Sequence, residues 1–147
     1  MIIINKIKEY KHRNLSIGRV KNLDKRNPNV FCIEKISWDV HWQTDLYLAV
    51  IIRDYLRFFI INSPAVGNCV YENRIEDMYD LEKSDYYSKK WKKMVNNVAD
   101  EFDELVKLMN RSNSGEIKDY LKFENKMKNL EKRAFADLAD IFGDLNW

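Results

Sequence analysis

The chain has few residues that break regular secondary structure and few that could cross-link it. Its 147 residues include four Gly, two Pro and two Cys. Because Gly and Pro punctuate turns, their scarcity favours long helices. Cys32 and Cys69 have neither metal-ligand nor redox-motif spacing, so they are predicted to be reduced core thiols of a cytosolic protein. A chain of this length can bury roughly two-thirds of the surface that its unfolded state exposes, and it can fold without disulfides or bound metals. We therefore expect one domain.

Enzyme signatures are also missing from the sequence. It has no glycine-rich phosphate loop, no nucleophile elbow and no HExxH motif. Its two histidines, His12 and His41, lie in different parts of the chain, which argues against a His-rich metal site. The acids from Asp100 to Glu104 lack Glu-x-x-His pairing and are predicted to form a solvated helix face. We therefore expect a protein that is not an enzyme and uses no cofactor or metal.

No hydrophobic run marks a signal peptide or a membrane span. The apolar start, Met1–Ile4, is too short for a signal sequence. The most hydrophobic run, Leu46–Ile61, is shorter than the roughly 20 residues that span a bilayer, and it contains charged residues. We expect a protein of the cytoplasm, which can be the cytoplasm of an infected host cell, and we expect no membrane partner.

Charge is unevenly distributed along the chain. Residues 1–28 carry eight Lys/Arg and two acids, a balance of +6, whereas the remainder has a balance of −4. A basic end of this kind can meet nucleic acid, an anionic surface or an acidic partner, and it is as often a solvated surface. Because no nucleic-acid-binding motif accompanies it, binding of nucleic acid is the weaker alternative.

The run Leu46–Ile61 predicts a central helix, because it is apolar on all sides apart from Arg53, Asp54 and Arg57. Thr44 is the expected N-cap. The two arginines stand one turn apart and form a cationic pair. Asp54 is the one local acid, so the second positive charge needs either an acid elsewhere in the fold or an anionic ligand. The sequence leaves both alternatives open.

Two amphipathic helices are predicted downstream, from Ser84 or Asp85 to about Asn110 and from about Glu116 to Phe142. The first has a strict heptad seam. The seam comprises Trp91, Val95, Val98, Phe102, Leu105 and Met109. The second helix is predicted to carry one apolar stripe, which comprises Tyr120, Phe123, Met127, Leu130, Ala134, Leu138, Ile141 and Leu145. Joined by a short turn, the two helices form an antiparallel hairpin that can clasp the helix at residues 46–61. The seam and the terminal Trp147 leave a homo-oligomer open.

The predicted fold class is therefore mainly α, a helical bundle built on a central apolar helix, with a small N-terminal accessory segment. The predicted organisation is a single domain over residues 1–147, comprising a basic accessory segment 1–36 and a helical core 37–147. Within the accessory segment, strands are expected at Ile2–Ile7, Ser16–Val20 and Val30–Ile36. A first helix through Ile7 and Tyr10 is the alternative.

Lysines and tryptophans supply further candidate ligand-binding residues. Lysines near the start of a helix oppose its dipole, and they would suit an anion together with the free N–H groups there, although they are as readily a solvated surface. Tryptophans can stack a nucleobase, but at helical spacing they are more often core residues. The candidate ligand-binding residues are Arg53, Arg57, Trp38, Trp42, Trp91, Lys89 and Lys92.

From Trp38 onward, the chain resembles a recurrent class of small, uncharacterised bacteriophage proteins. These have a Trp/Asp-containing lead into an apolar helix, then a helix that opens on Trp, and a final helix that ends near Leu-Trp. The corresponding segments here are Trp38-Asp39 with Asp45–Ala49, Trp91–Phe102 and Phe135–Trp147. The ending departs from the pattern, since Asn146 separates Leu145 from Trp147. The resemblance implies a phage origin and a helical fold, and it supplies no activity or catalytic residues.

Small phage proteins that are not enzymes often disarm host defence, and by this analogy we expect a counter-defence role. The first hypothesis is a phage-encoded, non-enzymatic binding protein that sequesters a small anionic ligand, such as a nucleotide immune signal. The alternative is a phage protein that inhibits or adapts a host protein by direct protein–protein binding. The weaker alternative is binding of nucleic acid through the basic N-terminus.

Overall fold

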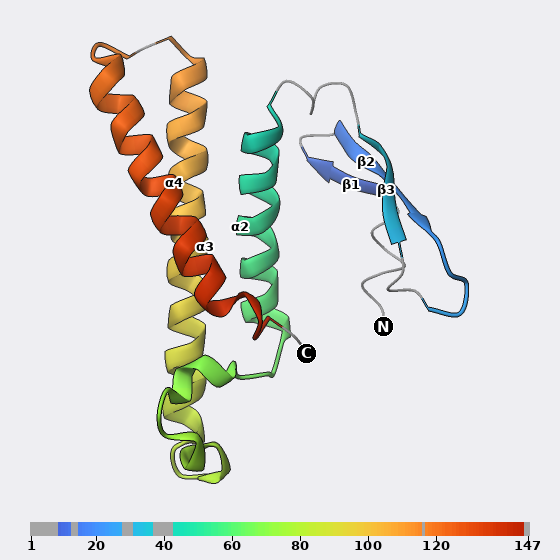
Figure 1. Cartoon of the computed structure of the whole chain (residues 1–147), viewed down its shortest axis with the longest axis vertical. Coiled ribbons are helices and arrows are strands. Elements are labelled where there is room, and N and C mark those ends of the chain that lie inside the picture. Colours follow the sequence, from blue (N-terminus) through green and yellow to red (C-terminus); the bar gives the residue numbers. More distant parts are fainter. Residues whose placement is uncertain (1–8, 13–14, 28–30, 37–42, 116, 146–147) are drawn as a thin grey trace. The chain divides into compact units, whose positions relative to one another are not determined.

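The computed structural model describes residues 9–12, 15–27, 31–36, 43–115 and 117–145 (Figure 1). The chain divides into two compact units, Met1–Tyr47 and Leu48–Trp147, and each is described by itself. The single domain expected from the sequence therefore stays a prediction. The described elements are mainly α-helical, as the sequence predicts.

The first unit contains a three-stranded antiparallel sheet in the order β1-β2-β3. The strands are β1 (Glu9–His12), β2 (Leu15–Asn22) and β3 (Phe31–Ile36). The predicted strands Ser16–Val20 and Val30–Ile36 overlap β2 and β3, whereas the predicted strand Ile2–Ile7 lies outside the described residues. Tyr10 lies in β1, not in a first helix.

The helices of the second unit follow one another with short 3-10 turns between the first two. They are α2 (Thr44–Asn62), which begins in the first unit, η1 (Asn68–Tyr71), η2 (Ile75–Tyr79), α3 (Ser84–Asn113) and α4 (Tyr120–Phe142). α4 begins four residues later than the sequence predicts. The reason is Asp119, whose carboxylate accepts a hydrogen bond from the backbone N–H of Lys122 and so caps the helix at this point.

The antiparallel hairpin of α3 and α4 holds the core of this unit (Figure 1). All six residues of the predicted heptad seam of α3 are buried, which confirms the seam. α4 contributes Leu130, Ala134 and Ile141 to the same core. α2 joins it through Phe59, whose ring meets the ring of Trp91 edge to face at 6.3 Å. Burying large aromatic side chains of this kind is a main source of folding free energy.

The two cysteines differ in environment, and neither forms a disulfide. Cys32 is exposed, so its prediction as a core thiol is wrong. Cys69 is half-buried, and its backbone N–H donates to the Asp144 carboxylate at 2.8 Å. Burial first, and then the neighbouring Asp144, raise the pKa of the Cys69 thiol to about 11. This thiol therefore stays protonated and unreactive at neutral pH.

A carboxylate buried between α3 and α4 gives the hairpin a pH dependence. The Glu101 side chain is 16% exposed and accepts a hydrogen bond from Arg133 Nε at 2.7 Å. Its second oxygen, Oε2, has no hydrogen-bond partner in the described part of the chain. Burial, and then the like charge of Asp137, raise the pKa of Glu101 above its ordinary value of 4.5. The folded state therefore favours the protonated form.

Glu101→Gln is expected to stabilise the protein at neutral pH and to leave stability unchanged in mild acid. Because the pKa of Glu101 is raised in the folded state, the contribution of Glu101 to stability is fully present below about pH 4.5 and is lost as the pH rises through the folded-state pKa. The neutral amide keeps an acceptor for Arg133 and escapes this loss. Urea denaturation of both proteins across this pH range measures the difference. A variant that is less stable at neutral pH would show instead that the Arg133 ion pair dominates.

Candidate functional site

Arg53 and Arg57 of α2 lie against acids of α3. Arg53 Nε lies 2.8 Å from Asp54 Oδ1, and its Nη1 lies 3.2 Å from Asp103 Oδ1. Arg57 Nη2 lies 3.5 Å from Asp100 Oδ1 and 3.9 Å from Asp103 Oδ2. The Asp54 carboxylate contributes most to raising the pKa of Arg53. An anionic ligand at this place would have to compete with these carboxylates, so ligand binding by the two arginines stays a prediction.

The acids of α3 that pair with these arginines, Asp100 and Asp103, were expected to lie on a solvated helix face. That expectation is wrong for Asp103, whose side chain is only 19% exposed, while Asp100 is more than half exposed. The ion pair between Arg53 and Asp103 joins residues 50 positions apart. Such a contact depends on how α2 packs on α3, and no local pattern in the sequence reports it.

Those of the other predicted ligand-binding residues that the structure describes do not come together in one site. Trp91 is 2% exposed, so its ring belongs to the core and has no free face for a base. Lys89 is exposed and pairs with Asp85 at 2.6 Å, and Lys92 is exposed. Trp38 and Trp42 lie outside the described residues. The candidate role of the lysines in ligand binding therefore stays a prediction. Trp91 is a core residue, which is the alternative that the sequence analysis gives for tryptophans at helical spacing.

A polar pocket of about 330 Å³ lies between η1, η2 and the start of α3. Its centre is Asp77, which accepts hydrogen bonds from Lys83 Nζ at 2.7 Å and from Tyr87 Oη at 2.5 Å. These two donors, Lys83 first, hold the pKa of Asp77 below its ordinary value. At its rim, Lys90 bonds to Glu72 at 2.9 Å. The carboxylates of this pocket are satisfied internally, which is typical of a structural network.

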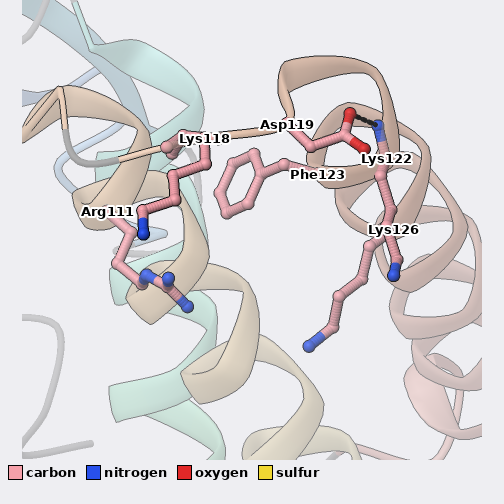
Figure 2. A pocket seen from close by; sticks show the side chains of 7 residues that line it. Arg111, Lys118, Asp119, Lys122, Phe123 and Lys126 are labelled. Atoms are coloured by element: carbon pink, nitrogen blue, oxygen red, sulfur yellow. Dashed lines mark hydrogen bonds between the residues drawn. The ribbon is translucent and has the colours of Figure 1, made fainter.

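A hollow of about 560 Å³ lined mostly by cations lies at the turn between α3 and α4 (Figure 2). We call it the basic pocket. It is lined by Arg111, Ile117, Lys118, Asp119, Lys122, Phe123 and Lys126. Four cations and one carboxylate thus surround a single space, which gives its described lining a net positive charge.

Most cations of the basic pocket form no ion pair with a carboxylate among the described residues. Its carboxylate, Asp119, is engaged as the cap of α4 at 3.1 Å from the Lys122 nitrogen. Lys126 reaches a carboxylate, Glu104, at the longer distance of 3.7 Å. Within the part of the chain that the structure describes, Arg111, Lys118 and Lys122 form no ion pair. The N-terminus of α4 adds a partial positive charge to this place.

Phe123 supplies the apolar part of the basic pocket. Figure 2 shows its ring between the side chains of Arg111 and Lys118 on one side and those of Lys122 and Lys126 on the other. The residue is half-buried, so part of its ring faces the hollow. An aromatic face beside several cations can stack a planar base while the cations hold attached phosphates.

Sequence reasoning missed the basic pocket. Phe123 was assigned to the apolar stripe of the last helix, and the segment after Asn110 was treated only as a turn. A partial signal was present in the spacing of Lys122 and Lys126, because residues four apart stand on one helix face. Lys118 lies before the start of α4, so helical spacing does not report it. What the spacing does not report is Arg111, which comes from the end of α3 and faces these lysines only once the hairpin has closed.

Comparison of the chain with protein-family models, with curated proteins and with solved structures finds no match. The resemblance to phage proteins therefore remains an expectation from the sequence. Among the described residues, no helix combines the length and apolar character that a membrane span requires. The same residues contain no cluster of His, Cys, Asp and Glu suited to a metal ion.

Proposed function

We propose that this chain is a non-enzymatic binding protein that captures a small anionic ligand, such as a nucleotide signal, in the basic pocket. The observation that carries the proposal is the placement of four cations and an aromatic ring around one hollow, with its one carboxylate engaged as a helix cap. In keeping with the resemblance, the proposed setting is a phage-encoded protein that withdraws a nucleotide immune signal from its host receptor.

The electrostatics favour the basic pocket over the arginines of α2 as the place for an anion. Arg53 and Arg57 each already contact two carboxylates. A ligand there would gain little, because it would replace existing charge pairs with similar ones. In the basic pocket, Arg111 and Lys118 have no such partner in the described chain, and a phosphate would supply it. Arginine in particular can grip a phosphate with two parallel hydrogen bonds.

The chemistry of the lining also favours capture over turnover. Its polar groups are ammonium and guanidinium ions, which bind anions and do not act as bases at neutral pH. Asp119, the carboxylate of the lining, accepts a hydrogen bond from the backbone N–H of Lys122 as the cap of α4. A volume of about 560 Å³ lies within the range of roughly 300–1,000 Å³ that is usual for small-molecule sites.

The proposal is tested by searching for the ligand in two ways. Denaturing the purified protein and analysing the released small molecules by mass spectrometry would reveal a co-purified nucleotide. A thermal-shift screen of mono-, di- and cyclic nucleotides should give a concentration-dependent rise in Tm, since a ligand at 100 times its Kd adds about 2.7 kcal/mol of stability. No released nucleotide together with a flat screen would contradict the proposal.

A further inference from the structure

The cations of the basic pocket stand in two pairs. Arg111 and Lys118 lie on one side of the Phe123 ring, and we call them the turn pair, because they come from the end of α3 and from the turn after it (Figure 2). Lys122 and Lys126 lie on the other side of the ring, and we call them the helix pair, because they stand one turn apart on α4. An aromatic ring thus separates two cationic places within one hollow.

Both places can accept an anion. Among the described residues, both members of the turn pair and Lys122 form no ion pair. Lys126 reaches Glu104 at 3.7 Å, and both of these side chains are exposed. Exposed ion pairs contribute little to stability, so a phosphate can replace Glu104 at small cost.

One phosphate group cannot bind both pairs at the same time. A charge-assisted hydrogen bond between nitrogen and oxygen spans about 2.7–2.9 Å. A phosphate bound this closely by the turn pair has the ring of Phe123 between itself and the helix pair. A chain of two or three phosphates leaves the nucleoside from a single atom. With the base stacked on Phe123, such a chain extends toward one pair and leaves the other pair without an anion.

We propose that the ligand of the basic pocket is a nucleotide with two separate phosphate groups, one bound by the turn pair and one by the helix pair, with its base stacked on Phe123. The inference rests on the proposed function, because it names the class of nucleotide that the same pocket captures. It also supplies a specificity that sequestration of a signal needs, since the abundant nucleotides with a single phosphate chain would bind less tightly.

Three adenine nucleotides test the placement of the phosphates on the full-length protein. Adenosine 3′,5′-bisphosphate is an isomer of adenosine 5′-diphosphate. It has about the charge of adenosine 5′-triphosphate, because each of its phosphate monoesters carries nearly two charges at neutral pH. Adenine serves as the probe base, since the described lining has no amide or hydroxyl side chain to read a base edge and stacking tolerates every base.

Calorimetry should show that the bisphosphate binds about tenfold or more tightly than the diphosphate and the triphosphate, because it alone gives each pair a phosphate. Equal or tighter binding of either single-chain nucleotide would overturn the inference and leave the proposed function standing. Failure of all three to bind would overturn the inference and, together with a flat nucleotide screen, the proposed function as well.

Two double variants test the division of the cations into pairs. Arg111→Ala with Lys118→Ala and Lys122→Ala with Lys126→Ala should each weaken binding of the bisphosphate about tenfold or more, because each removes one phosphate position. Adenosine 5′-monophosphate fills one position, so only one of the two variants should weaken its binding. If both variants weakened binding of the monophosphate alike, the four cations would converge on one phosphate and the inference would be wrong.

Lys93→Ala with Lys132→Ala is the matched control, because both lysines are exposed and neither lines the basic pocket. This variant loses the same charge and should bind the bisphosphate like the wild type. Circular dichroism establishes that each variant is folded before its titration. A control variant that binds as weakly as the pocket variants would show that the net charge of the protein attracts the ligand, and it would overturn the inference.

Discussion

Trp91→Ala is expected to lower the free energy of unfolding by about 3–5 kcal/mol, the usual cost of removing a large aromatic side chain from a core. Trp91 is among the largest fully buried side chains of the described chain, at 2% exposure, and its ring contacts Phe59 of α2. Its loss would leave a cavity where α2 meets α3. Guanidinium denaturation, followed by circular dichroism at 222 nm, measures the change.

Tyr79→Ala is the matched control for this variant. Tyr79 is 82% exposed, so removing its ring should change stability by less than about 0.5 kcal/mol. A loss below about 1 kcal/mol for Trp91→Ala would show that the Trp91 ring is not part of the core. That result would return Trp91 to consideration as a stacking platform for a ligand.

Gly67→Ala is expected to destabilise the protein by about 1–3 kcal/mol, the range for overpacking a well-filled core. An added Cβ would lie 2.6 and 2.7 Å from two ring atoms of Trp91 and 2.9 Å from Cβ of Asp144. The backbone of Gly67, at φ −66° and ψ 141°, suits alanine, so the whole cost is steric. It outweighs the roughly 0.4–1 kcal/mol that alanine gains by restricting the unfolded chain.

Gly143→Ala separates the steric effect from the general effect of replacing glycine. Gly143 has φ −65° and ψ −20°, and an added Cβ there would meet nothing within 4 Å. This variant should be neutral or slightly more stable, as judged from the midpoint of thermal unfolding. If the two variants behaved alike, the close approach of the segment at Gly67 to the Trp91 ring would be contradicted.

The helices of this protein could be predicted from the sequence because their information is local. The heptad seam of α3 repeats over more than two heptads, and every seam residue is buried. The end of a helix is less predictable, because a single side chain decides it. Asp119 moves the start of α4 to Tyr120, and as a result Tyr120, which was placed on the buried stripe, is 58% exposed.

The sequence could predict which types of side chain form the candidate site, but not where in the fold they lie. The sequence indicated that paired cations and aromatic rings would matter, but it placed them on α2 and at the start of α3. The partners of Arg53 and Arg57 are acids on a different helix, and the basic pocket needs Arg111 to face lysines across a turn. Both facts depend on how helices pack, which local sequence patterns do not encode.

The most direct test of the central claim is a titration of the nucleotide with the largest thermal shift against variants of the basic pocket. Arg111→Ala with Lys118→Ala removes two cations that have no ion pair of their own in the described chain. Lys93→Ala with Lys132→Ala removes the same charge from exposed positions that do not line the basic pocket and serves as the control. Calorimetry should show an affinity loss of about tenfold or more for the pocket variant, since a hydrogen bond to a charged group contributes a net of about 1.5–3 kcal/mol. The control should bind like the wild type. Equal affinity of the pocket variant and the wild type, with both folded, would contradict the account.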